Sequence, residues 1–425
     1  MERFALSRMK EWKENENRKP LIIRGARQVG KTWIMKTFGQ QYFEKTAYVN
    51  FDNNARMKQV FEGDLDIERL VLAISAETGV SIEAENTLII FDEIQEVPKA
   101  LTSLKYFHEN APQYAIVAAG SLLGVALHQG TSFPVGKVDF LDLYPLNFRE
   151  FLCAMGEKQF VSMLDSCDTQ MVTVFKTKYI ERLREYYFVG GMPEVVKDFS
   201  EKKDYNRVRV IQKNLINYYQ QDFSKHAEIK LVPRLNLVWN SIPMQLAKEN
   251  KKYIYGQVRE GSRAKDFELA IQWLLDCGLI HKVQRIQKPD LPLKAYIDFD
   301  AFKLFLVDIG LLIAMTDLDA KVIIEGNKIF TEFKGALTEQ YILQQLISDV
   351  GVIPYYYSTQ NSKGEIDFLV QGKTSVIPIE VKAEENLKAK SLKAFCEKYQ
   401  PSYAVRTSMS DYREQDWMTN IPLYA

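Results

Sequence analysis

The first third of the chain alternates between short apolar runs and longer amphipathic stretches. Apolar runs of this length predict buried strands, and the stretches between them carry apolar residues at helical spacing. A short amphipathic helix is expected before the first run, with Phe4, Met9 and Trp12 on one face. Strands that alternate with helices predict a parallel, doubly wound α/β sheet. The predicted strands are 21–23, 46–51, 87–91, 114–119 and 136–143.

The middle of the chain, from about residue 152 to 245, is rich in helix formers. The stretch 179–188 is apolar on one face and ends at the stop signal Gly190-Gly191-Met192-Pro193. A polar helical face there includes His226, which no partner at motif spacing accompanies, so a structural role is favoured. This region is predicted to form a helical lid.

The next segment has the order of elements that is typical of a winged helix. The pattern predicts a strand at 251–258, an amphipathic helix at 262–276 and a turn with a returning strand at 278–283. Basic residues at the start of that helix lie where they could contact DNA phosphates, but neighbouring acids weaken their positive electrostatic potential. A lid or a protein contact is therefore favoured over DNA binding. The basic residues are Arg259, Arg263 and Lys265, and the acids are Glu260, Asp266 and Glu268.

The C-terminal part predicts one more helix and a group of strands. A helical pattern covers 331–346, and 355–358 is strand-like. Two apolar strands at 364–370 and 376–382 follow, joined by the short turn 371–373. The sequence therefore predicts a β-hairpin packed with a helix, in a small α/β domain.

Composition places the chain among globular proteins and limits its partners. Of 425 residues, 46% are hydrophobic and 26% charged, which argues against long disorder and predicts two to three domains. Fifty-five basic residues balance 55 acidic ones, so nucleic acid would have to be bound by a local patch. The four cysteines lack metal-ligand spacing, and no apolar run has the length of a membrane span or the place of a signal peptide. We expect a cytoplasmic protein with reduced thiols and no membrane partner.

The stretch between the first strand and the first helix after it has the pattern of a phosphate-binding loop, G-x-x-x-x-G-K-[ST]. Glycines permit tight turns close to an anion, and backbone N–H groups then point at the α and β phosphates. Lys31 is expected to reach the β and γ phosphates, and Thr32 to place its hydroxyl on Mg2+. The predicted ATP-binding residues are Gly25, Ala26, Arg27, Gln28, Val29, Gly30, Lys31, Thr32 and Asp92.

A pair of acids at the end of the third predicted strand supplies the second half of this site. Parallel sheets place ligands at the carboxyl ends of their strands, where Asp92 and Glu93 emerge. Asp92 is expected to hold Mg2+, directly or through water, and Glu93 to polarise the attacking water. Ser121, after the fourth strand, is expected to sense the γ phosphate or to align the water. The predicted cofactors are ATP and Mg2+.

These motifs together resemble a known family. The chain is similar to prokaryotic AAA-type P-loop ATPases that carry a C-terminal domain of unknown function, and the strand added to the sheet favours the additional-strand ATPases over nucleotide kinases. Family members often have Gly-Arg before the fifth strand, where this chain has Gly136-Lys137. Lysine lacks the planar fork that clamps phosphates, so the identity of an arginine finger stays open. The resemblance is carried by residues 25–32, 91–95, 119–121, 146–151 and 190–194.

The C-terminal hairpin carries a second constellation of charged residues. Asp367 and Glu380 are on adjacent strands, and Glu380 and Lys382 share a face because they are two residues apart. With Glu339 from the preceding helix, they resemble the constellation of restriction-endonuclease-like folds. That resemblance implies that the acids hold Mg2+ and that the lysine orients the attacking water. An ordinary salt-bridged surface is the alternative, and function must be argued from the site.

The sequence thus predicts a P-loop ATPase domain at 1–155, a helical and winged-helix-like region at 156–295, and a restriction-endonuclease-like α/β domain at 296–425. The first functional hypothesis is an ATPase that hydrolyses Mg-ATP and drives a nuclease-like domain acting on DNA. The alternative is a nucleotide-dependent switch that binds a protein partner and cuts nothing. Whether the C-terminal domain cleaves DNA, and whether the protein forms an oligomer, stay open.

Overall fold

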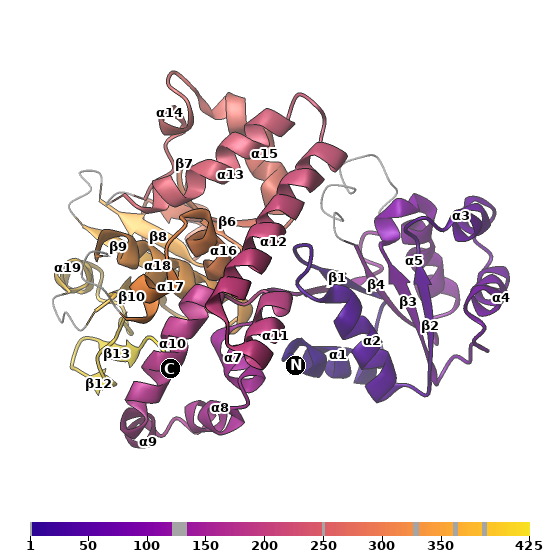
Figure 1. Cartoon of the computed structure of the whole chain (residues 1–425), viewed down its shortest axis with the longest axis horizontal. Coiled ribbons are helices and arrows are strands. Elements are labelled where there is room, and N and C mark those ends of the chain that lie inside the picture. Colours follow the sequence, from indigo (N-terminus) through magenta and orange to yellow (C-terminus); the bar gives the residue numbers. More distant parts are fainter. Residues whose placement is uncertain (1, 121–133, 249–250, 326–330, 360–363, 385–388) are drawn as a thin grey trace. The chain divides into compact units, whose positions relative to one another are not determined.

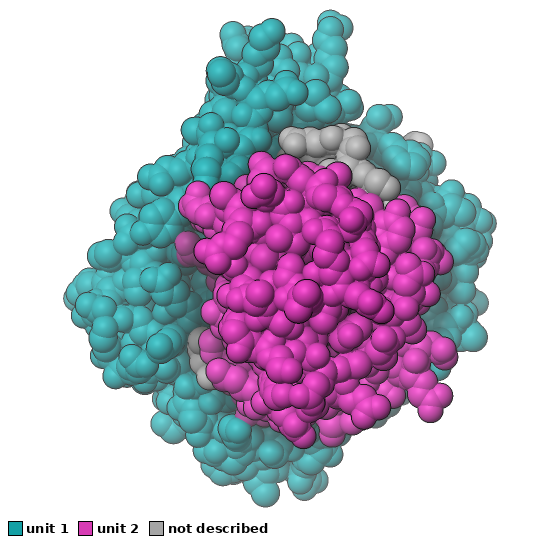
Figure 2. Space-filling model, turned by 90° about the vertical axis from the view of Figure 1, so that its right-hand side faces the viewer, with its two compact units in different colours: residues 1, 145–275, 279–425 teal, residues 2–144, 276–278 magenta. Residues whose placement is uncertain are grey.

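The computed structural model describes residues 2–120, 134–248, 251–325, 331–359, 364–384 and 389–425. These residues fall into two compact units, coloured differently in Figure 2. Unit 2 consists of Glu2–Tyr144 with Asp276–Gly278, and unit 1 of Pro145–Leu275 with Leu279–Ala425. Among the described helices, none is long and apolar enough to cross a membrane.

Unit 2 is built on a five-stranded sheet in the order β2-β3-β4-β1-β5, and every pair of neighbours is parallel. This result confirms the predicted parallel α/β sheet. All six residues of β3 are buried, as expected for a central strand that is covered on both faces. β4 lies between β1 and β3, so one strand separates the two halves of the predicted site. The strands are β1 (Leu21–Arg24), β2 (Lys45–Asn50), β3 (Thr87–Asp92), β4 (Ala115–Ala119) and β5 (Asp139–Asp142).

Two helices of unit 2, α3 and α4, begin at residues whose side chains cap them. The side chain of Asn54 accepts a hydrogen bond from the Met57 N–H, and Asp66 caps the next helix in the same way. Edge-to-face contacts of phenylalanine rings pack these helices on the sheet, with Phe61 and Phe91 5.8 Å apart. Figure 1 shows the unit in indigo and purple. Its helices are α1 (Ala5–Glu14), α2 (Lys31–Tyr42), α3 (Ala55–Glu62), α4 (Ile67–Thr78), the 3-10 turn η1 (Ile94–Glu96) and α5 (Pro98–Asn110).

The first half of unit 1 is helical, as the composition predicts. Asn147 and Glu150 form a capping box, in which each side chain accepts a hydrogen bond from the backbone N–H of the other. The described helices from residue 148 to the C-terminal part of the chain are α7 (Phe148–Ala154), α8 (Lys158–Asp165), α9 (Thr169–Val174), α10 (Lys176–Val189), α11 (Pro193–Lys202), α12 (Tyr205–His226), α13 (Val232–Leu246), α14 (Tyr255–Val258), α15 (Ala264–Asp276), α16 (Ile309–Met315), α17 (Ala320–Ile324), α18 (Thr331–Ser348) and α19 (Lys390–Tyr399).

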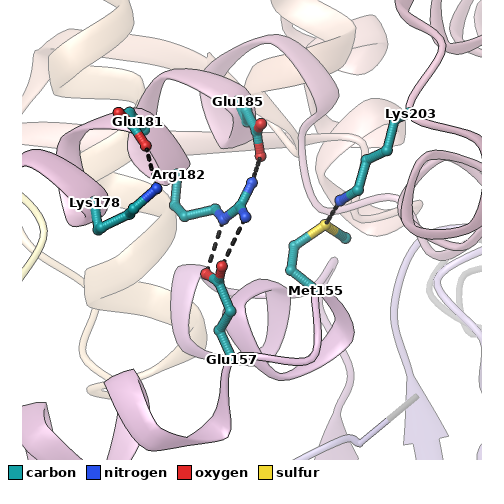
Figure 3. A network of polar contacts seen from close by, with 7 residues as sticks. All are labelled: Met155, Glu157, Lys178, Glu181, Arg182, Glu185 and Lys203. Atoms are coloured by element: carbon teal, nitrogen blue, oxygen red, sulfur yellow. Dashed lines mark hydrogen bonds and ion pairs between the residues drawn. The ribbon is translucent and has the colours of Figure 1, made fainter.

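An ion-pair network fixes α10 to the turn between α7 and α8 (Figure 3). The guanidinium of Arg182 donates two hydrogen bonds to Glu157, at 2.6 and 2.8 Å, and one to Glu185 at 2.6 Å. These bonds raise the pKa of Arg182 above its ordinary value. Beside this network, Lys203 places its ammonium 2.9 Å from the sulfur of Met155. Bidentate pairing of this kind gives the junction a defined geometry.

The glycines of the stop signal at 190–193 allow a close approach between backbones. A Cβ on Gly191 would lie 2.1 Å from the carbonyl oxygen of Leu146. The Gly191 N–H donates to the buried carboxylate of Asp308 at 2.6 Å, which also caps α16 through the Leu311 N–H. Burial raises the pKa of Asp308 to about 6, against the effect of these hydrogen bonds. The stop signal therefore joins the starts of α7, α11 and α16.

The strand predicted at 251–258 is wrong. Tyr255–Val258 is the short helix α14, and before it the Tyr253 N–H donates to the Phe302 carbonyl at 2.8 Å while the Ile254 N–H donates to the Gln245 side chain at 3.2 Å. Tyr253 and Phe302 stack with centroids 5.5 Å apart, so the apolar residues anchor a turn instead of alternating along a strand. The predicted helix and returning strand do form, as α15 and β6 (Ile280–Ile286). A separate winged helix is not shown, because β6 belongs to a larger sheet.

That larger sheet has eight strands in the order β12-β13-β11-β10-β9-β8-β6-β7. The predicted hairpin is present as β9 and β10, which pair antiparallel with Ile379 opposite Phe368. β7 pairs antiparallel with β6 along its length, so the sheet runs across the division expected at residue 295. Its further strands are β7 (Ile297–Leu306), β8 (Tyr355–Ser358), β9 (Glu365–Gln371), β10 (Val376–Val381), β11 (Val405–Ser408), β12 (Arg413–Glu414) and β13 (Thr419–Pro422). The 3-10 turn η2 (Leu293–Tyr296) precedes β7.

Candidate nucleotide-binding site

The loop between β1 and α2 has the backbone of an anion cradle. Gly25 and Gly30 have φ angles of 146° and 96°, in the region that favours glycine, and Gln28 also has a positive φ of 66°. A Cβ on Gly25 would lie 2.1 Å from the Leu143 carbonyl oxygen, so only glycine fits there. Gly30 precedes the first turn of α2 and has no side chain to cap it. The N–H groups of that turn are therefore placed to receive an anion.

Lys31 lies inside this loop. Its side chain is buried, and the ammonium donates hydrogen bonds to the carbonyl oxygens of Gly25 and Ala26, both at 2.8 Å. Burial lowers the pKa of Lys31 to about 8, and the nearby carboxylates of Glu93 and Asp92 oppose that shift. Among the described residues, the Lys31 ammonium donates hydrogen bonds to carbonyl oxygens alone, and a buried cation in that state is ready to accept a stronger, anionic partner.

The two halves of the predicted site meet at Asp92. Its Oδ2 accepts a hydrogen bond from the Thr32 hydroxyl at 2.7 Å and another from the Tyr48 hydroxyl at 2.9 Å. Burial and the charge of Asp92 raise the pKa of Tyr48 above its ordinary value, so the phenol stays a donor. A hydroxyl and a carboxylate side by side are the hard oxygen ligands that Mg2+ prefers.

Glu93 follows Asp92 at the carboxyl end of β3. Its φ of 51° places it in the left-handed region, which turns the chain sharply out of the strand. The Gln95 side-chain amide donates to Glu93 Oε2 at 2.7 Å. Glu93 thus lies next to Asp92, and the Gln95 amide orients one of its carboxylate oxygens.

Two supporting residues were missed at the sequence level. Tyr48 lies on β2, one strand beyond Asp92, and only the pairing of β2 with β3 brings its hydroxyl within reach. Arg3 lies before α1 and donates to the Val29 carbonyl at 3.0 Å and the Tyr144 carbonyl at 2.6 Å. It therefore fixes the backbone of the loop from outside. No local signal marks Arg3, because both acceptors are distant backbone atoms.

Two further predictions concern residues beyond the acidic strand. Ser121 lies outside the described residues, so its role stays a prediction. Lys137, considered at the sequence level in place of an arginine finger, forms an ion pair with Glu109 at 3.0 Å. Both side chains are about one-third exposed, and such a pair contributes little to stability.

Comparison with known proteins agrees with this geometry. Residues 17–152 match the AAA domain family. The N-terminal part of the chain is therefore similar to AAA-type P-loop domains. Residues 180–322 and 334–425 match two domains of unknown function, DUF8612 and DUF4143. None of the curated proteins matches the chain significantly.

Solved structures resemble the chain only distantly. The Walker-type ATPase PABY2304 of Pyrococcus abyssi is 14% identical, with a TM-score of 0.45, over 74% of this chain and 95% of that chain. The ORC1 protein of Aeropyrum pernix, solved in complex with DNA, is 13% identical, with a TM-score of 0.27, over 73% and 91%. A RuvB variant of Thermotoga maritima is 13% identical, with a TM-score of 0.29, over 65% and 87%. These values are too low to carry a functional assignment. The AAA-type domain therefore rests on the family match and on the site.

The residues of this AAA-type domain fit Mg-ATP. A glycine cradle, a buried lysine without an anionic hydrogen-bond partner and the pair Thr32 and Asp92 supply the groups that a magnesium–triphosphate needs.

The C-terminal constellation has a different set of contacts. Asp367 accepts a hydrogen bond from the Val381 N–H at 2.7 Å and shares a second hydrogen bond with Glu339. Burial, and then the charge of Glu339, raise the pKa of Asp367 to about 8. Glu380 contacts the Lys382 ammonium at 2.6 Å and accepts from the Leu392 N–H at 3.1 Å.

These carboxylates do not form the predicted metal site as they are arranged. Within the described ranges, no group of three or more His, Cys, Asp or Glu side chains could hold a metal ion. Glu339 instead pairs with Lys251 and Lys303. The residues present therefore do not fit Mg2+ in this arrangement, and we derive no cleavage step from them.

Proposed function

We propose that this protein binds Mg-ATP and hydrolyses it. The observation that carries the proposal is the position of Lys31, whose buried ammonium is held on two loop carbonyls at the N-terminus of α2. The hydrogen bond from Thr32 to Asp92 supports it, because it joins the loop to the acidic strand across β4. Both features belong to the AAA-type domain.

The side chains divide the work between binding and chemistry. The N–H groups at the start of α2 and the ammonium of Lys31 bind the phosphates, and Lys31 leaves the carbonyls of Gly25 and Ala26 to do so. Thr32 and Asp92 would hold Mg2+, which neutralises charge that develops on the phosphates. Glu93, oriented by Gln95, accepts the proton of the attacking water. Ser121 is proposed to sense the γ phosphate.

What the nucleotide cycle drives is the second part of the proposal. A nuclease-like domain acting on DNA and a switch that binds a protein partner both follow from the sequence. The pairing of Glu339 with two lysines favours the switch, because two ammonium groups already balance the charge of this carboxylate. We therefore propose a nucleotide-dependent switch whose C-terminal domain does not cleave.

ATP turnover measured with and without DNA tests both parts. The purified chain should hydrolyse ATP in Mg2+ at a rate that duplex or single-stranded DNA leaves unchanged, and Lys31→Ala should abolish turnover. ATP hydrolysis that DNA stimulates severalfold, together with DNA cleavage, would favour the nuclease hypothesis over the switch. A chain that neither binds nor hydrolyses ATP would refute the proposal as a whole.

A further inference from the structure

Charged side chains from four parts of unit 1 meet in one place, which we call the C-terminal cluster. It comprises Lys251, just before α14, Lys303 in β7, Glu339 in α18, and Glu365 and Asp367 in β9. The ammonium of Lys303 lies 2.5 Å from Glu365 Oε1 and 3.5 Å from Glu339 Oε2. Lys251 pairs with the other oxygen of Glu339. The exposed fraction of the side chain is 0% for Lys303 and 6% for Glu339.

We infer that Lys251 and Lys303 are built-in counter-cations of this cluster, so that the cluster ties four elements together and binds no divalent metal ion. The inference bears on the second part of the proposed function, and its tests need no nucleotide. It assigns a structural role to acids that the sequence pattern marks as metal ligands.

The reason lies in the cost of buried charge. An unpaired ammonium or carboxylate out of water costs several kcal/mol, and removing one partner of a buried pair leaves that cost uncompensated. Lys303 is in the interior of β7, with the Tyr356 ring 4.8 Å from its ammonium, so its side chain has no path to solvent. A metal ion that entered between Glu339 and Glu365 would have to share that space with a second cation.

Most of the carboxylate oxygens also have partners already, although Glu339 Oε2 accepts no hydrogen bond and lies 3.5 Å from the Lys303 ammonium. Each oxygen of Glu339 faces a lysine nitrogen, and Asp367 Oδ2 faces the Val381 N–H. Glu380 is engaged with Lys382 and with the N-terminus of α19. Magnesium demands near-octahedral oxygen coordination, which these oxygens offer only after their present partners leave.

The first test measures the stability that the two lysines provide. Lys303→Met should lower the Tm by at least about 5 °C, because it leaves the buried Glu339 and the half-buried Glu365 without the cation that they share. The double variant Lys303→Met with Glu365→Gln should recover part of this loss. Lys251→Met should lower the Tm less, and Lys294→Met, at an exposed position outside the cluster, should not lower it. Equal melting of Lys303→Met and wild type would overturn the inference.

The second test measures metal binding directly and does not depend on a lysine variant that folds. Wild type and Glu339→Gln are titrated with Mn2+ in the absence of nucleotide, with free Mn2+ followed by electron paramagnetic resonance. The amount of bound Mn2+ should be the same for wild type and Glu339→Gln, even if sites elsewhere in the chain bind some of it. EDTA should leave the wild-type Tm unchanged. One Mn2+ per wild-type chain that is lost in Glu339→Gln would overturn the inference.

Discussion

At the scale of single residues, Lys31 shows how burial tunes a ligand-binding group. Its pKa of about 8 is set by burial and is far below that of an exposed lysine. Only the charged form attracts phosphates, so ATP affinity should be constant below about pH 8 and weaken above it. Each further pH unit should raise the Kd about tenfold, since one pKa unit is about 1.4 kcal/mol.

Titration calorimetry of ATP binding between about pH 7 and pH 9.5 checks this prediction. Above pH 8, binding should also take up a proton, because phosphate contact restores the charge of Lys31. Lys31→Met provides the control, since its weaker binding should lose this part of the pH dependence. A wild-type Kd that stays flat across the range would contradict the assignment of Lys31.

Thr32 should act through the metal ion alone. Its hydroxyl contacts Asp92 and is expected to turn to Mg2+ when nucleotide binds. Thr32→Ala should therefore bind ATP without Mg2+ as wild type does, but lose most of the gain in affinity that Mg2+ brings. Thr32→Ser keeps the hydroxyl and should behave as wild type. Loss of metal-free ATP binding in Thr32→Ala would show that the residue supports the loop instead.

At the scale of elements, Gly191 joins two helices that are far apart in sequence. A Cβ there would meet the Leu146 oxygen at 2.1 Å and the Leu146 nitrogen at 2.8 Å. Gly191→Ala should lower the free energy of unfolding by about 2 kcal/mol or more. Gly335→Ala is the matched control, because a Cβ in α18 meets nothing within 4 Å and should leave stability equal or slightly higher. Urea unfolding distinguishes the two, and equal curves would refute the close approach.

The elements also show which features the sequence can predict. The phosphate loop and the acids after β3 depend on local order, strand, turn and helix, and the structure has Lys31 at the start of α2 and Asp92 at the end of β3, as the motif spacing predicts. Their roles in binding stay predictions. Lys251 and Glu339 are 88 residues apart, and nothing in the hairpin pattern signals that lysines from other elements pair with its acids. The strand expected at 251–258 was wrong for a similar reason, since Tyr253 packs on Phe302 of a distant strand.

At the scale of the whole molecule, the eight-stranded sheet makes the C-terminal region dependent on the segment before it. β8 has β6 and β9 as its neighbours, and Lys251 pairs with Glu339. The fragment 145–425 should therefore unfold cooperatively in urea, whereas 296–425, which lacks β6 and Lys251, should not. Circular dichroism of both fragments checks this. Cooperative unfolding of 296–425 would show that the domain predicted from the sequence is independent.

The central claim is that the intact chain hydrolyses ATP with Glu93 as the base, and one variant tests it most directly. Glu93→Gln keeps the size of the side chain and removes the base. Binding of ATP should stay at the wild-type level, while steady-state turnover falls by about 100-fold or more. Glu96→Gln, an exposed acid three residues later, is the control and should retain turnover. Undiminished hydrolysis in Glu93→Gln, or an equal loss of binding and turnover, would contradict the account.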